Sequence, residues 1–422
     1  MKKLNFCLPK HLFKCYNGCM GYDLTSDQIN ADKKIEKWFR TSTSQIFVLA
    51  GFAGTGKTTL LKYTVLETLG LKEDGVAFVT PTGKAATVLL RQGIPATTVH
   101  RLIYQSISTE TEVEINGKKI KIEKLSFKRR ESIDKSIKLI VLDEASMVPD
   151  NMLWDLMEFG VKILLCGDNA QLPPVEGFNT YLKEPDVTLK QIVRQQRDNP
   201  IIMLSEMARE GKYIPFGRYG ENALVLSKRQ FTGEKRKHYL TKADQIICGI
   251  NKTRTAVNDE LRAMRGLGVL PADGDKLICT INNWEQFIDS EYRYNLVNGI
   301  IGTVFNPFYD SSTDIGFMQF KVDFLDELCP DALPFDTGIF TDGRYRYRHG
   351  DYFEKFNEDG EPTGAFTLNR FEYGYCISCH KAQGSEFDNA VVFDESYAFK
   401  EDKSRWLYTA ITRAKKKLIL LR

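Results

Sequence analysis

The sequence has no hydrophobic run of about 20 residues, the length that a membrane-spanning helix requires. It also lacks a strong charge imbalance, because 58 basic and 55 acidic residues leave a formal net charge of +3 over 422 residues. This small excess argues against a large binding surface of one sign but is compatible with a local basic groove. Hydrophobic residues make up 42% and charged residues 27%, which excludes a fibrous repeat or a disordered chain. At about 150 residues per domain, the length allows two to four domains.

Cysteine occurs nine times, and an odd number in a long chain does not indicate a disulfide framework. A secretory signal is also missing, because no apolar stretch follows the basic first three residues. We therefore expect a cytoplasmic protein with reduced thiols and no membrane partner. Cys7, His11, Cys15 and Cys19 are metal-ligating residue types, but their spacing is not that of a standard zinc site. Zinc is the less favoured interpretation.

Short apolar runs alternate with helical patterns in the first half of the chain. They cover residues 46–50, 76–80, 137–142 and 162–166, and each ends at a polar motif. Continuous apolar runs of this length, interleaved with helices, predict a parallel sheet covered on both faces. Ligands bind beyond the carboxyl ends of the strands in such sheets. We therefore expect the polar motifs to form one site.

Alternating apolar and polar residues over 113–122 surround Asn116-Gly117, which predicts a β-hairpin with a type I′ turn. The hairpin is expected to be an insertion. A second α/β region should begin near residue 188, with a strand at 245–249. Residues 268–367 contain many aromatic residues and Gly, Asp and Asn turns, which predicts a small all-β module.

These patterns predict an α/β fold with four parts. The first α/β domain is expected to comprise residues 1–103 and 132–187, and the hairpin insertion 104–131. The second α/β domain is expected at 188–268 and 368–422, interrupted by the all-β insertion at 269–367.

The segment after the first apolar run fits the phosphate-binding pattern G-x-x-x-x-G-K-[ST], and it follows a strand and opens a helix as that pattern requires. Backbone N–H groups of such a loop point at phosphates, assisted by the positive end of the helix. Lys57 would pair with the β- and γ-phosphates, and Thr58 would ligate Mg²⁺. The loop reads Gly51, Phe52, Ala53, Gly54, Thr55, Gly56, Lys57 and Thr58.

Two carboxylates, Asp143 and Glu144, come directly after the third apolar run. Downstream of a phosphate-binding loop they suit hydrolysis, with Asp143 holding Mg²⁺ and Glu144 activating the attacking water. Asp-Glu alone is commonplace, so this interpretation depends on the loop. Gln171, which follows the fourth run, can sense a γ-phosphate or position water.

With these motifs in place, the chain resembles the superfamily 1B DNA helicases of the RecD-like and Dda-like branch. The resemblance covers residues from about 24 to 422. Gln-Leu-Pro-Pro-Val at 171–175 resembles motif III of the group that translocates 5′→3′. The resemblance implies two RecA-like P-loop domains, with a β-hairpin insertion in the first and an SH3-like insertion in the second.

The resemblance assigns further residues to an ATP site. Gln28 matches the Q motif, which reads the adenine edge. Arg194 in motif IV and Arg413 in motif VI match arginine fingers, although a surface salt bridge is the alternative for either. The remaining implied nucleotide contacts are Gly51, Ala53, Gly54, Thr55, Gly56, Lys57, Thr58, Thr59, Gln383, Gly384 and Glu386.

Motifs Ia, Ib and V imply contacts with single-stranded DNA. The alternatives are ordinary turn and cap chemistry for the threonines and a structural role for His380. Cys376 and Cys379 lie inside motif V and are interpreted as incidental. Asn116 and Gly117 at the hairpin tip would separate strands. The implied DNA contacts are Pro81, Thr82, Lys84, Thr98, His100, Ser378, His380 and Lys381.

Arginine and tyrosine alternate over residues 344–348, so a strand there would place the arginines on one face. The arginine face would then bind a nucleic-acid backbone. The favoured alternative is that this segment is a solvent-exposed edge strand.

The leading hypothesis is an ATP- and Mg²⁺-dependent DNA helicase that moves 5′→3′ and acts in replication, repair or recombination. We expect a monomer that binds single-stranded DNA and duplex junctions, with a single-strand-binding protein as a further candidate partner. An RNA helicase or RNA-stimulated ATPase is the nearest alternative. A nucleic-acid remodelling module that uses ATP as a switch is another.

Overall fold

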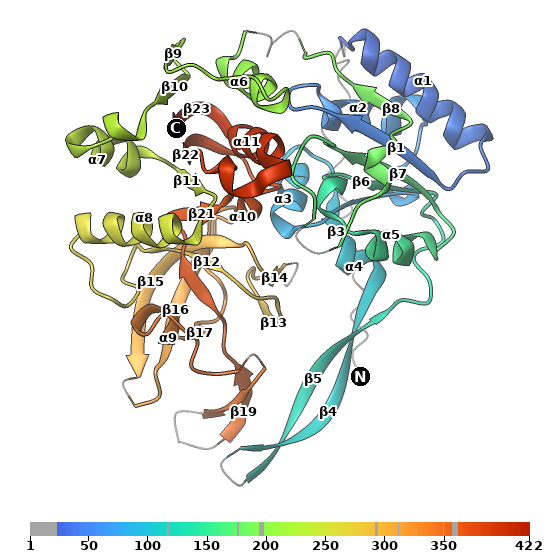
Figure 1. The fold of residues 1–422 in the computed structure, drawn as a ribbon. Helices are drawn as coiled ribbons and strands as arrows, with labels where there is room; N and C mark the ends of the chain where they lie inside the picture. The colour runs from blue at the N-terminus through green and yellow to red at the C-terminus, as the bar shows by residue number, and fades with distance from the viewer. Residues whose placement is uncertain are drawn as a thin grey trace. The chain divides into compact units, whose positions relative to one another are not determined.

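The computed structural model describes residues 23–422, except 116–117, 175–176, 194–197, 292–293, 311, 349 and 357–361. The chain divides into two compact units, and Figure 1 labels many of their elements. Unit 1 comprises residues 1–104, 129–231 and 383–422, and unit 2 comprises 105–128 and 232–382. The units are described one at a time.

Unit 1 contains the predicted parallel sheet, in which every strand pairs in parallel with its neighbours. The apolar runs form its strands because both faces of the sheet are covered, and all four residues of β6 are buried. In spatial order the strands are β3 (Ala96–Thr98), β2 (Val76–Thr80), β6 (Leu139–Leu142), β7 (Lys162–Gly167), β1 (Ile46–Gly51) and β8 (Val187–Leu189).

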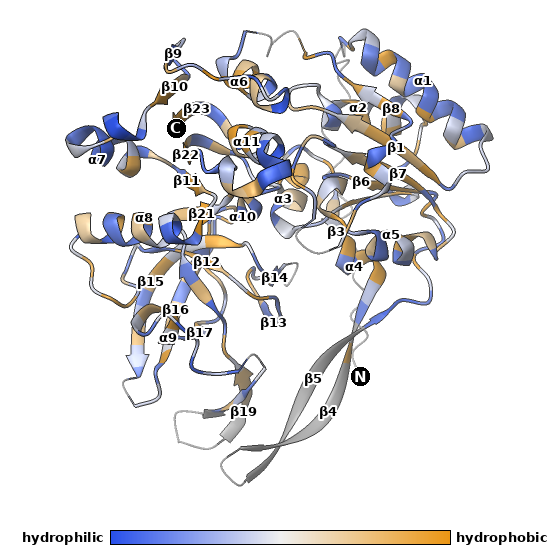
Figure 2. Ribbon diagram, in the orientation of Figure 1, coloured by the Kyte–Doolittle hydropathy of each residue, from blue (hydrophilic) through white to orange (hydrophobic). Residues whose placement is uncertain are grey.

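Helices pack on both faces of this sheet. One buried cluster joins the sheet to the first three helices and another joins it to the next two. Figure 2 shows the hydrophobic strands between them. The helix that follows the phosphate-binding loop changes after Tyr63 to a π-helix, η1 (Thr64–Thr68). The helices are α1 (Ser26–Thr41), α2 (Lys57–Tyr63), α3 (Gly83–Arg91), α4 (Val99–Ile103) and α5 (Asp150–Met157).

The remainder of unit 1 has a second set of strands, with β22, β23 and β10 parallel and β9 antiparallel at the edge. Helices α6 and α11 belong to this part and pack against each other. The elements are α6 (Pro200–Arg209), β9 (Gly217–Tyr219), β10 (Ala223–Leu226), β22 (Phe387–Phe393), η7 (Ser396–Asp402), α11 (Lys403–Ile411) and β23 (Ala414–Leu421).

The first sheet extends further along the chain than the sequence pattern indicates. Strand β8 pairs with β1 through Leu49–Val187 and Gly51–Leu189. The predicted boundary between residues 187 and 188 therefore falls inside a strand. Three residues are too few to show a hydrophobic period, so the sequence pattern did not reveal β8.

Unit 2 contains a parallel strand pair with two longer helices. Strands β11 and β21 pair in register from Ile246 with Cys376 to Cys248 with Ser378. Helix α7 is hydrophilic along most of its length (Figure 2). The elements are α7 (Gly233–Lys242), β11 (Gln245–Cys248), α8 (Asn251–Met264), β21 (Cys376–Ser378) and the short α10 (Cys379–Ala382).

The predicted all-β region is a five-stranded antiparallel sheet within unit 2, with its own buried core. Strand β20 lies beyond residue 367, where α/β structure was expected to resume, yet it pairs with β12 in this sheet. In spatial order the strands are β17 (Leu333–Asp336), β16 (Ile315–Val322), β15 (Ile301–Asp310), β12 (Lys276–Cys279) and β20 (Phe371–Tyr373).

Three two-stranded ribbons and a short helix complete unit 2. The ribbon of β4 and β5 contains the predicted hairpin and is longer than the alternation indicates, with 12 residues in each strand. Its tip residues Asn116 and Gly117 lie outside the described residues. The elements are β4 (Tyr104–Ile115), β5 (Lys118–Arg129), β13 (Asn283–Phe287), β14 (Asn295–Leu296), β18 (Tyr352–Phe356), β19 (Pro362–Thr367) and α9 (Gly338–Thr341).

The strand predicted at 344–348 is wrong, because this segment consists of bends and irregular backbone. The buried Asp336 carboxylate accepts backbone N–H bonds from Arg346 at 2.8 Å and Tyr347 at 3.0 Å. The Arg346 guanidinium pairs with Asp314 and Asp342. Because a carboxylate takes these N–H groups, they are not available to a neighbouring strand.

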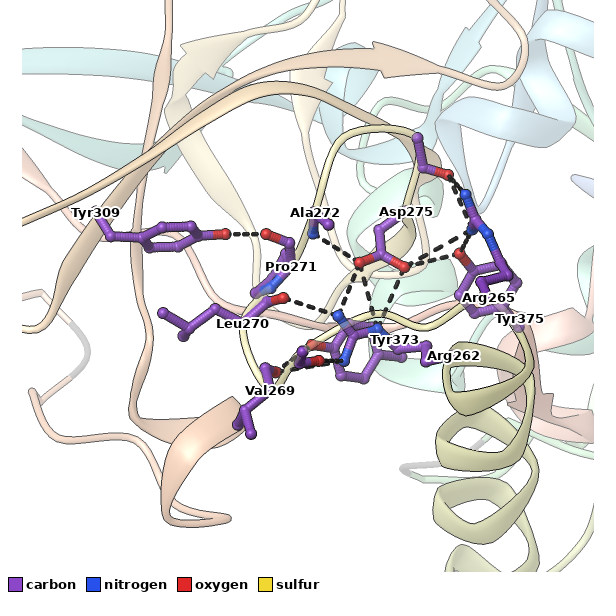
Figure 3. Close-up of polar contacts among 12 residues, drawn as sticks. Arg262, Arg265, Val269, Leu270, Pro271, Ala272, Asp275, Tyr309, Tyr373 and Tyr375 are labelled. Atoms are coloured by element: carbon purple, nitrogen blue, oxygen red, sulfur yellow. Dashed lines mark hydrogen bonds and ion pairs between the residues drawn. The ribbon is translucent and has the colours of Figure 1, made fainter.

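A buried ion pair joins α8 to the chain that enters the five-stranded sheet (Figure 3). The Arg262 and Asp275 side chains are 6% and 0% exposed, and Nη2 lies 3.0 Å from Oδ2. The Arg262 guanidinium also donates to the carbonyls of Gly268 and Leu270, and the Tyr375 hydroxyl donates to Asp275 at 2.7 Å. Both charges are therefore satisfied by several partners, which a buried pair requires.

Replacing Arg262 by alanine should destabilise unit 2 by about 3–5 kcal/mol, because the Asp275 carboxylate would stay buried without its cation. Hydrogen exchange of the α8 and β12 amides should accelerate by about 10²-fold or more. Arg265→Ala is the matched control, since Arg265 is 41% exposed and lies 3.9 Å from the same carboxylate. An equal effect of both substitutions would contradict this prediction.

Candidate active site

The phosphate-binding loop lies between β1 and α2, as predicted. Gly54 and Gly56 have φ of +77° and +71°, a left-handed conformation that side chains disfavour. A Cβ at Gly56 would also lie 2.7 Å from the Gln28 amide nitrogen. The Lys57 ammonium donates to the carbonyls of Gly51 at 2.8 Å and Phe52 at 3.2 Å. The loop thus forms a cradle around the lysine, with Thr59 exposed.

Gln28 is a buried residue of α1 whose amide contacts the loop. Its Nε2 donates to the carbonyls of Thr55 at 3.0 Å and Gly56 at 3.4 Å. Its Oε1 accepts from the N–H of Thr25 and completes a capping box at the start of α1. Gln28 therefore supports the loop directly, and its contact with adenine stays a prediction.

The acidic pair lies where β6 ends, facing the loop. The Asp143 Oδ2 atom is 3.4 Å from the Thr58 hydroxyl, and Oδ1 accepts the N–H of Glu144 at 2.9 Å. Glu144 has φ of +55°, which is uncommon outside glycine and marks a sharp turn at the strand end. This turn directs consecutive carboxylates into the same site.

Charges in the site shift one another's pKa. Burial alone would lower the pKa of Lys57, but Asp168, Glu144 and Asp143 raise it above its ordinary value. Burial raises the pKa of Asp143, and burial with the Asp143 charge raises that of Glu144, against the opposing charge of Arg413. These charges favour the protonated form of Lys57, and Glu144 takes up a proton more readily than an exposed glutamate, as a general base requires.

Gln171 follows β7 and is buried. Within the described part of the chain, its Oε1 atom has no hydrogen-bond partner, and the same holds for Asn169 Oδ1 and Ser146 Oγ. Buried polar atoms without partners are rare in proteins and indicate a site for water or ligand. All three belong to segments that follow β6 or β7, at the same edge as the acidic pair.

Arg413 follows α11 and is 4% exposed. Its guanidinium donates to the carbonyls of Thr409 at 3.0 Å and Ser385 at 3.1 Å, and to the Thr412 hydroxyl. It is held inside the protein, so a surface salt bridge does not explain it. Arg194 lies outside the described residues.

Motif V begins in unit 2 and continues into unit 1. In unit 1, Gln383 is buried and donates to the Leu172 carbonyl at 2.9 Å, which joins motif V to motif III. A Cβ at Gly384 would lie 3.5 Å from the Thr82 hydroxyl, so motifs V and Ia are neighbours. Glu386 is exposed.

The residues predicted to contact DNA in unit 1 have structural roles as well. Thr82 caps α3 and Thr98 caps α4, each accepting a backbone N–H at 3.2 Å. The Lys84 ammonium lies 4.5 Å from the centre of the Phe387 ring. His100 lies beside Tyr104, and burial lowers the pKa of its imidazole. Pro81 is half-buried in the turn before α3.

In unit 2, Ser378, His380 and Lys381 lie at the end of β21 and in α10. The Ser378 hydroxyl accepts the N–H of Lys381 at 3.3 Å. The Lys381 ammonium lies 3.7 Å from Glu372, which also pairs with Arg254. Burial lowers the pKa of Lys381, although Glu372 opposes this. The Glu372 carboxylate thus offsets part of the positive charge of Lys381 and Arg254.

Three side chains around the loop were not assigned a role from the sequence. The Tyr408 hydroxyl contacts Ala53 and Asp168, and the Arg209 guanidinium lies over the Phe52 ring. Asp168 lies three residues before Gln171 and Tyr408 five residues before Arg413, so their nearness to predicted site residues was a signal. Arg209 is the last residue of α6 and belongs to no recognisable motif, so only the tertiary structure reveals its contact with Phe52.

The donors present suit a magnesium ion. Thr58 and Asp143 place a hydroxyl and a carboxylate oxygen 3.4 Å apart, and Mg²⁺ prefers such oxygen ligands while keeping several waters. Among the described residues, no group of three or more His, Cys, Asp or Glu side chains is placed to hold a metal. Cys376 and Cys379 are buried. Cys7, His11, Cys15 and Cys19 lie outside the described residues.

None of the helices in the described part of the chain is both long and apolar enough to cross a membrane.

Comparisons with known proteins point to one family. The profile of the "AAA domain" family matches residues 24–228, and that of the "UvrD-like helicase C-terminal domain" matches residues 373–421. The chain is 26% identical to the ATP-dependent RecD2 DNA helicase of Deinococcus radiodurans, over 88% of this chain and 46% of that protein. It is 29% identical to the ATP-dependent DNA helicase dda of Enterobacteria phage T4, over 93% of this chain and 98% of that protein.

Among solved structures, Pif1 helicase from Bacteroides in complex with ADP-AlF3 and ssDNA is 18% identical, with a TM-score of 0.49 and coverage of 94% of this chain and 92% of that one. The chain spans less than half the length of several curated relatives, including the Deinococcus protein. Both profiles and both named relatives support a superfamily 1B helicase of the RecD-like and Dda-like branch, and the phosphate-binding loop, acidic pair and buried arginine in unit 1 agree with this similarity.

Proposed function

We propose that this protein is an ATP-dependent DNA helicase that moves 5′→3′ on single-stranded DNA and unwinds duplex. The observation that carries the proposal is the convergence, within unit 1, of the loop lysine, the acidic pair and a buried arginine. Arg413 and Lys57 both oppose the rise in the pKa of Glu144, and Glu144 helps to raise the pKa of Lys57. Such a set suits phosphoryl transfer, in which catalysis consists of positioning and of stabilising negative charge.

Each residue has a role in this proposal. Lys57 leaves the carbonyls of its own loop and pairs with the β- and γ-phosphates. Glu144 accepts the proton of the attacking water, which Gln171 orients through its unpartnered oxygen. Arg413 stabilises the charge of the transition state. Thr58 and Asp143 would hold Mg²⁺, which would neutralise phosphate charge when bound.

Coupling to DNA would follow from alternating affinity. Nucleotide occupancy changes the contacts of Gln383 and Gly384, which adjoin motifs III and Ia in unit 1. Thr82, Lys84 and His100 in unit 1, and Ser378 and Lys381 in unit 2, would then hold the strand with changing strength. Motion arises because each state binds DNA with a different free energy. Asn116 and Gly117 stay predicted strand-separation residues, and the four-part domain division stays a proposal.

The deciding experiment is steady-state ATP hydrolysis without polymer, with single-stranded DNA and with single-stranded RNA. Stimulation by DNA, followed by unwinding of forked duplexes with 5′ but not 3′ loading strands, is expected. Stimulation by RNA alone would favour an RNA helicase instead. Stimulation by DNA without unwinding would favour a remodelling module. Lys57→Ala protein serves as the blank.

Replacing Glu144 by glutamine should lower ATP turnover by about 10²-fold, because the amide cannot accept a proton from water. The variant should still bind ATP and retain it unhydrolysed, which a single-turnover assay with product separation detects. Glu184→Gln is the matched control, since Glu184 is exposed in the same unit. Normal product formation by the Glu144 variant would exclude its role as the base.

A further inference from the structure

One tyrosine hydroxyl connects three separate segments around the phosphate-binding loop. Tyr408 lies on α11 and is 1% exposed. Its hydroxyl donates to Oδ2 of Asp168, which follows β7, and accepts the backbone N–H of Ala53 in the loop at 2.7 Å. The phosphate-binding loop is therefore hydrogen-bonded to α11, the helix that precedes β23.

The direction of these two hydrogen bonds is determined by the surroundings. Burial and the Asp168 carboxylate hold the pKa of Tyr408 well above its ordinary value, so the hydroxyl keeps its proton and donates it to Asp168. The hydroxyl oxygen then accepts from Ala53. Asp168 is 0% exposed, and its other oxygen accepts the Ala170 N–H at 3.0 Å. Phenylalanine at 408 would leave both a buried carboxylate oxygen and a loop N–H without this partner.

A second contact reaches the neighbouring loop residue from another helix. Arg209, at the end of α6, places its guanidinium carbon 3.7 Å from the centre of the Phe52 ring, which is the geometry of a cation–π interaction. Helices α6 and α11 pack against each other. Consecutive loop residues, Phe52 and Ala53, are thus held by two neighbouring helices.

These contacts lie between the loop and the arginine that follows α11. The Arg413 guanidinium is held in part by the Thr409 carbonyl, and Thr409 is the residue after Tyr408. Its hydroxyl accepts the Leu172 N–H at 2.9 Å. Because backbone N–H groups of such loops bind phosphates, nucleotide binding acts on the same segment that Tyr408 contacts. Tyr408, which contacts Ala53, and Thr409, which holds Arg413, are therefore consecutive residues of α11.

We propose that Tyr408 is a positioning residue, whose hydroxyl links occupancy of the phosphate-binding loop to the placement of Arg413, with the Arg209–Phe52 contact as a second link. This inference rests on the proposed hydrolysis of ATP. It concerns coupling and not chemistry, because Tyr408 contacts the loop backbone and Asp168 and has no assigned contact with the reacting atoms.

The test is Tyr408→Phe, which removes only the hydroxyl. DNA-stimulated kcat should fall about tenfold, while the Kd for a fluorescent ATP analogue changes less than about threefold. Tyr219→Phe is the matched control, because its hydroxyl donates to the Pro215 carbonyl at 2.8 Å in the same unit. An unchanged kcat in Tyr408→Phe, with an active wild-type protein, would overturn the inference and leave the proposed function intact. An inactive wild-type protein would overturn the proposed function itself.

A double-mutant cycle separates coupling from a structural role. If Tyr408 acts through Arg413, Tyr408→Phe should change the single-turnover rate less than about twofold in Arg413→Ala protein. A further tenfold loss there would mean that the two residues act independently, and would overturn the inference. If Tyr408→Phe does not fold, Arg209→Met tests the second link, the Arg209–Phe52 contact. It should lower kcat about threefold at unchanged nucleotide affinity, and no change would count against the coupling.

Discussion

Arg413→Ala protein is expected to hydrolyse ATP about 10³-fold more slowly than the unmodified protein, the lower end of the range for an arginine finger. Nucleotide affinity should change far less, because the proposed contact forms in the transition state. The guanidinium is suited to this because it is planar, permanently charged and bidentate. Its charge already acts on Glu144. Single-turnover hydrolysis together with equilibrium nucleotide binding measures both quantities.

Two controls make the Arg413 result interpretable. Arg405→Ala removes an exposed arginine of α11 that pairs with Asp402 at 3.6 Å, and it should leave turnover unchanged. Arg413→Lys keeps the charge but loses the fork that bonds Ser385 and Thr409, and it should restore only a small part of the rate. A loss of affinity with unchanged turnover would contradict the finger role. Thermal unfolding of each variant detects a merely structural effect.

Lys57→Ala should lower ATP turnover by about 10³-fold, because the loop would lose the cation that stabilises the transferred phosphoryl group. Burial lowers the lysine's pKa, but Asp168, Glu144 and Asp143 more than offset this, so the charge is present at neutral pH. Binding of single-stranded DNA in the absence of nucleotide should be largely intact. Steady-state hydrolysis and fluorescence anisotropy with labelled DNA measure the two effects.

Lys62→Ala is the matched control for Lys57→Ala. Lys62 lies in the same helix and donates to the Gln92 carbonyl at 3.2 Å at an exposed position. Its loss should change turnover less than about twofold. Near-normal hydrolysis by Lys57→Ala protein would refute the assigned site. Equal losses of hydrolysis and of DNA binding would indicate misfolding, which thermal unfolding would reveal.

Patterns confined to one segment were predicted well. The apolar runs before the phosphate-binding loop and before Asp143 form strands β1 and β6, which both pair in parallel with β7, because a run of that kind suits a strand buried on both faces. The phosphate-binding loop could be predicted from its own residues, since its glycines set the local backbone conformation and Lys57 donates to carbonyls of the same loop. Residues 344–348 had an equally clear alternation, but the Asp336 carboxylate accepts the N–H groups of Arg346 and Tyr347.

The sequence also failed to predict short strands that form only because they pair with a strand from another part of the chain. Strand β8 exists because its three residues pair with β1. Strand β20 joins the antiparallel sheet because β12 lies beside it. Neither has enough residues to show a period, so their hydrogen-bond partners and burial determined their state.

By itself, the sequence determined the phosphate-binding loop, the acidic pair, the parallel-sheet class and the motifs by which the family was recognised, because these depend on residues that are close along the chain. Only the tertiary structure decided that Tyr408 contacts Ala53 across 355 positions and that Arg209 covers Phe52. It also decided that Arg262 and Asp275 are buried as a pair. Such contacts have no periodic signature, since a hydrogen bond or an ion pair requires only that two groups meet in space and leave water.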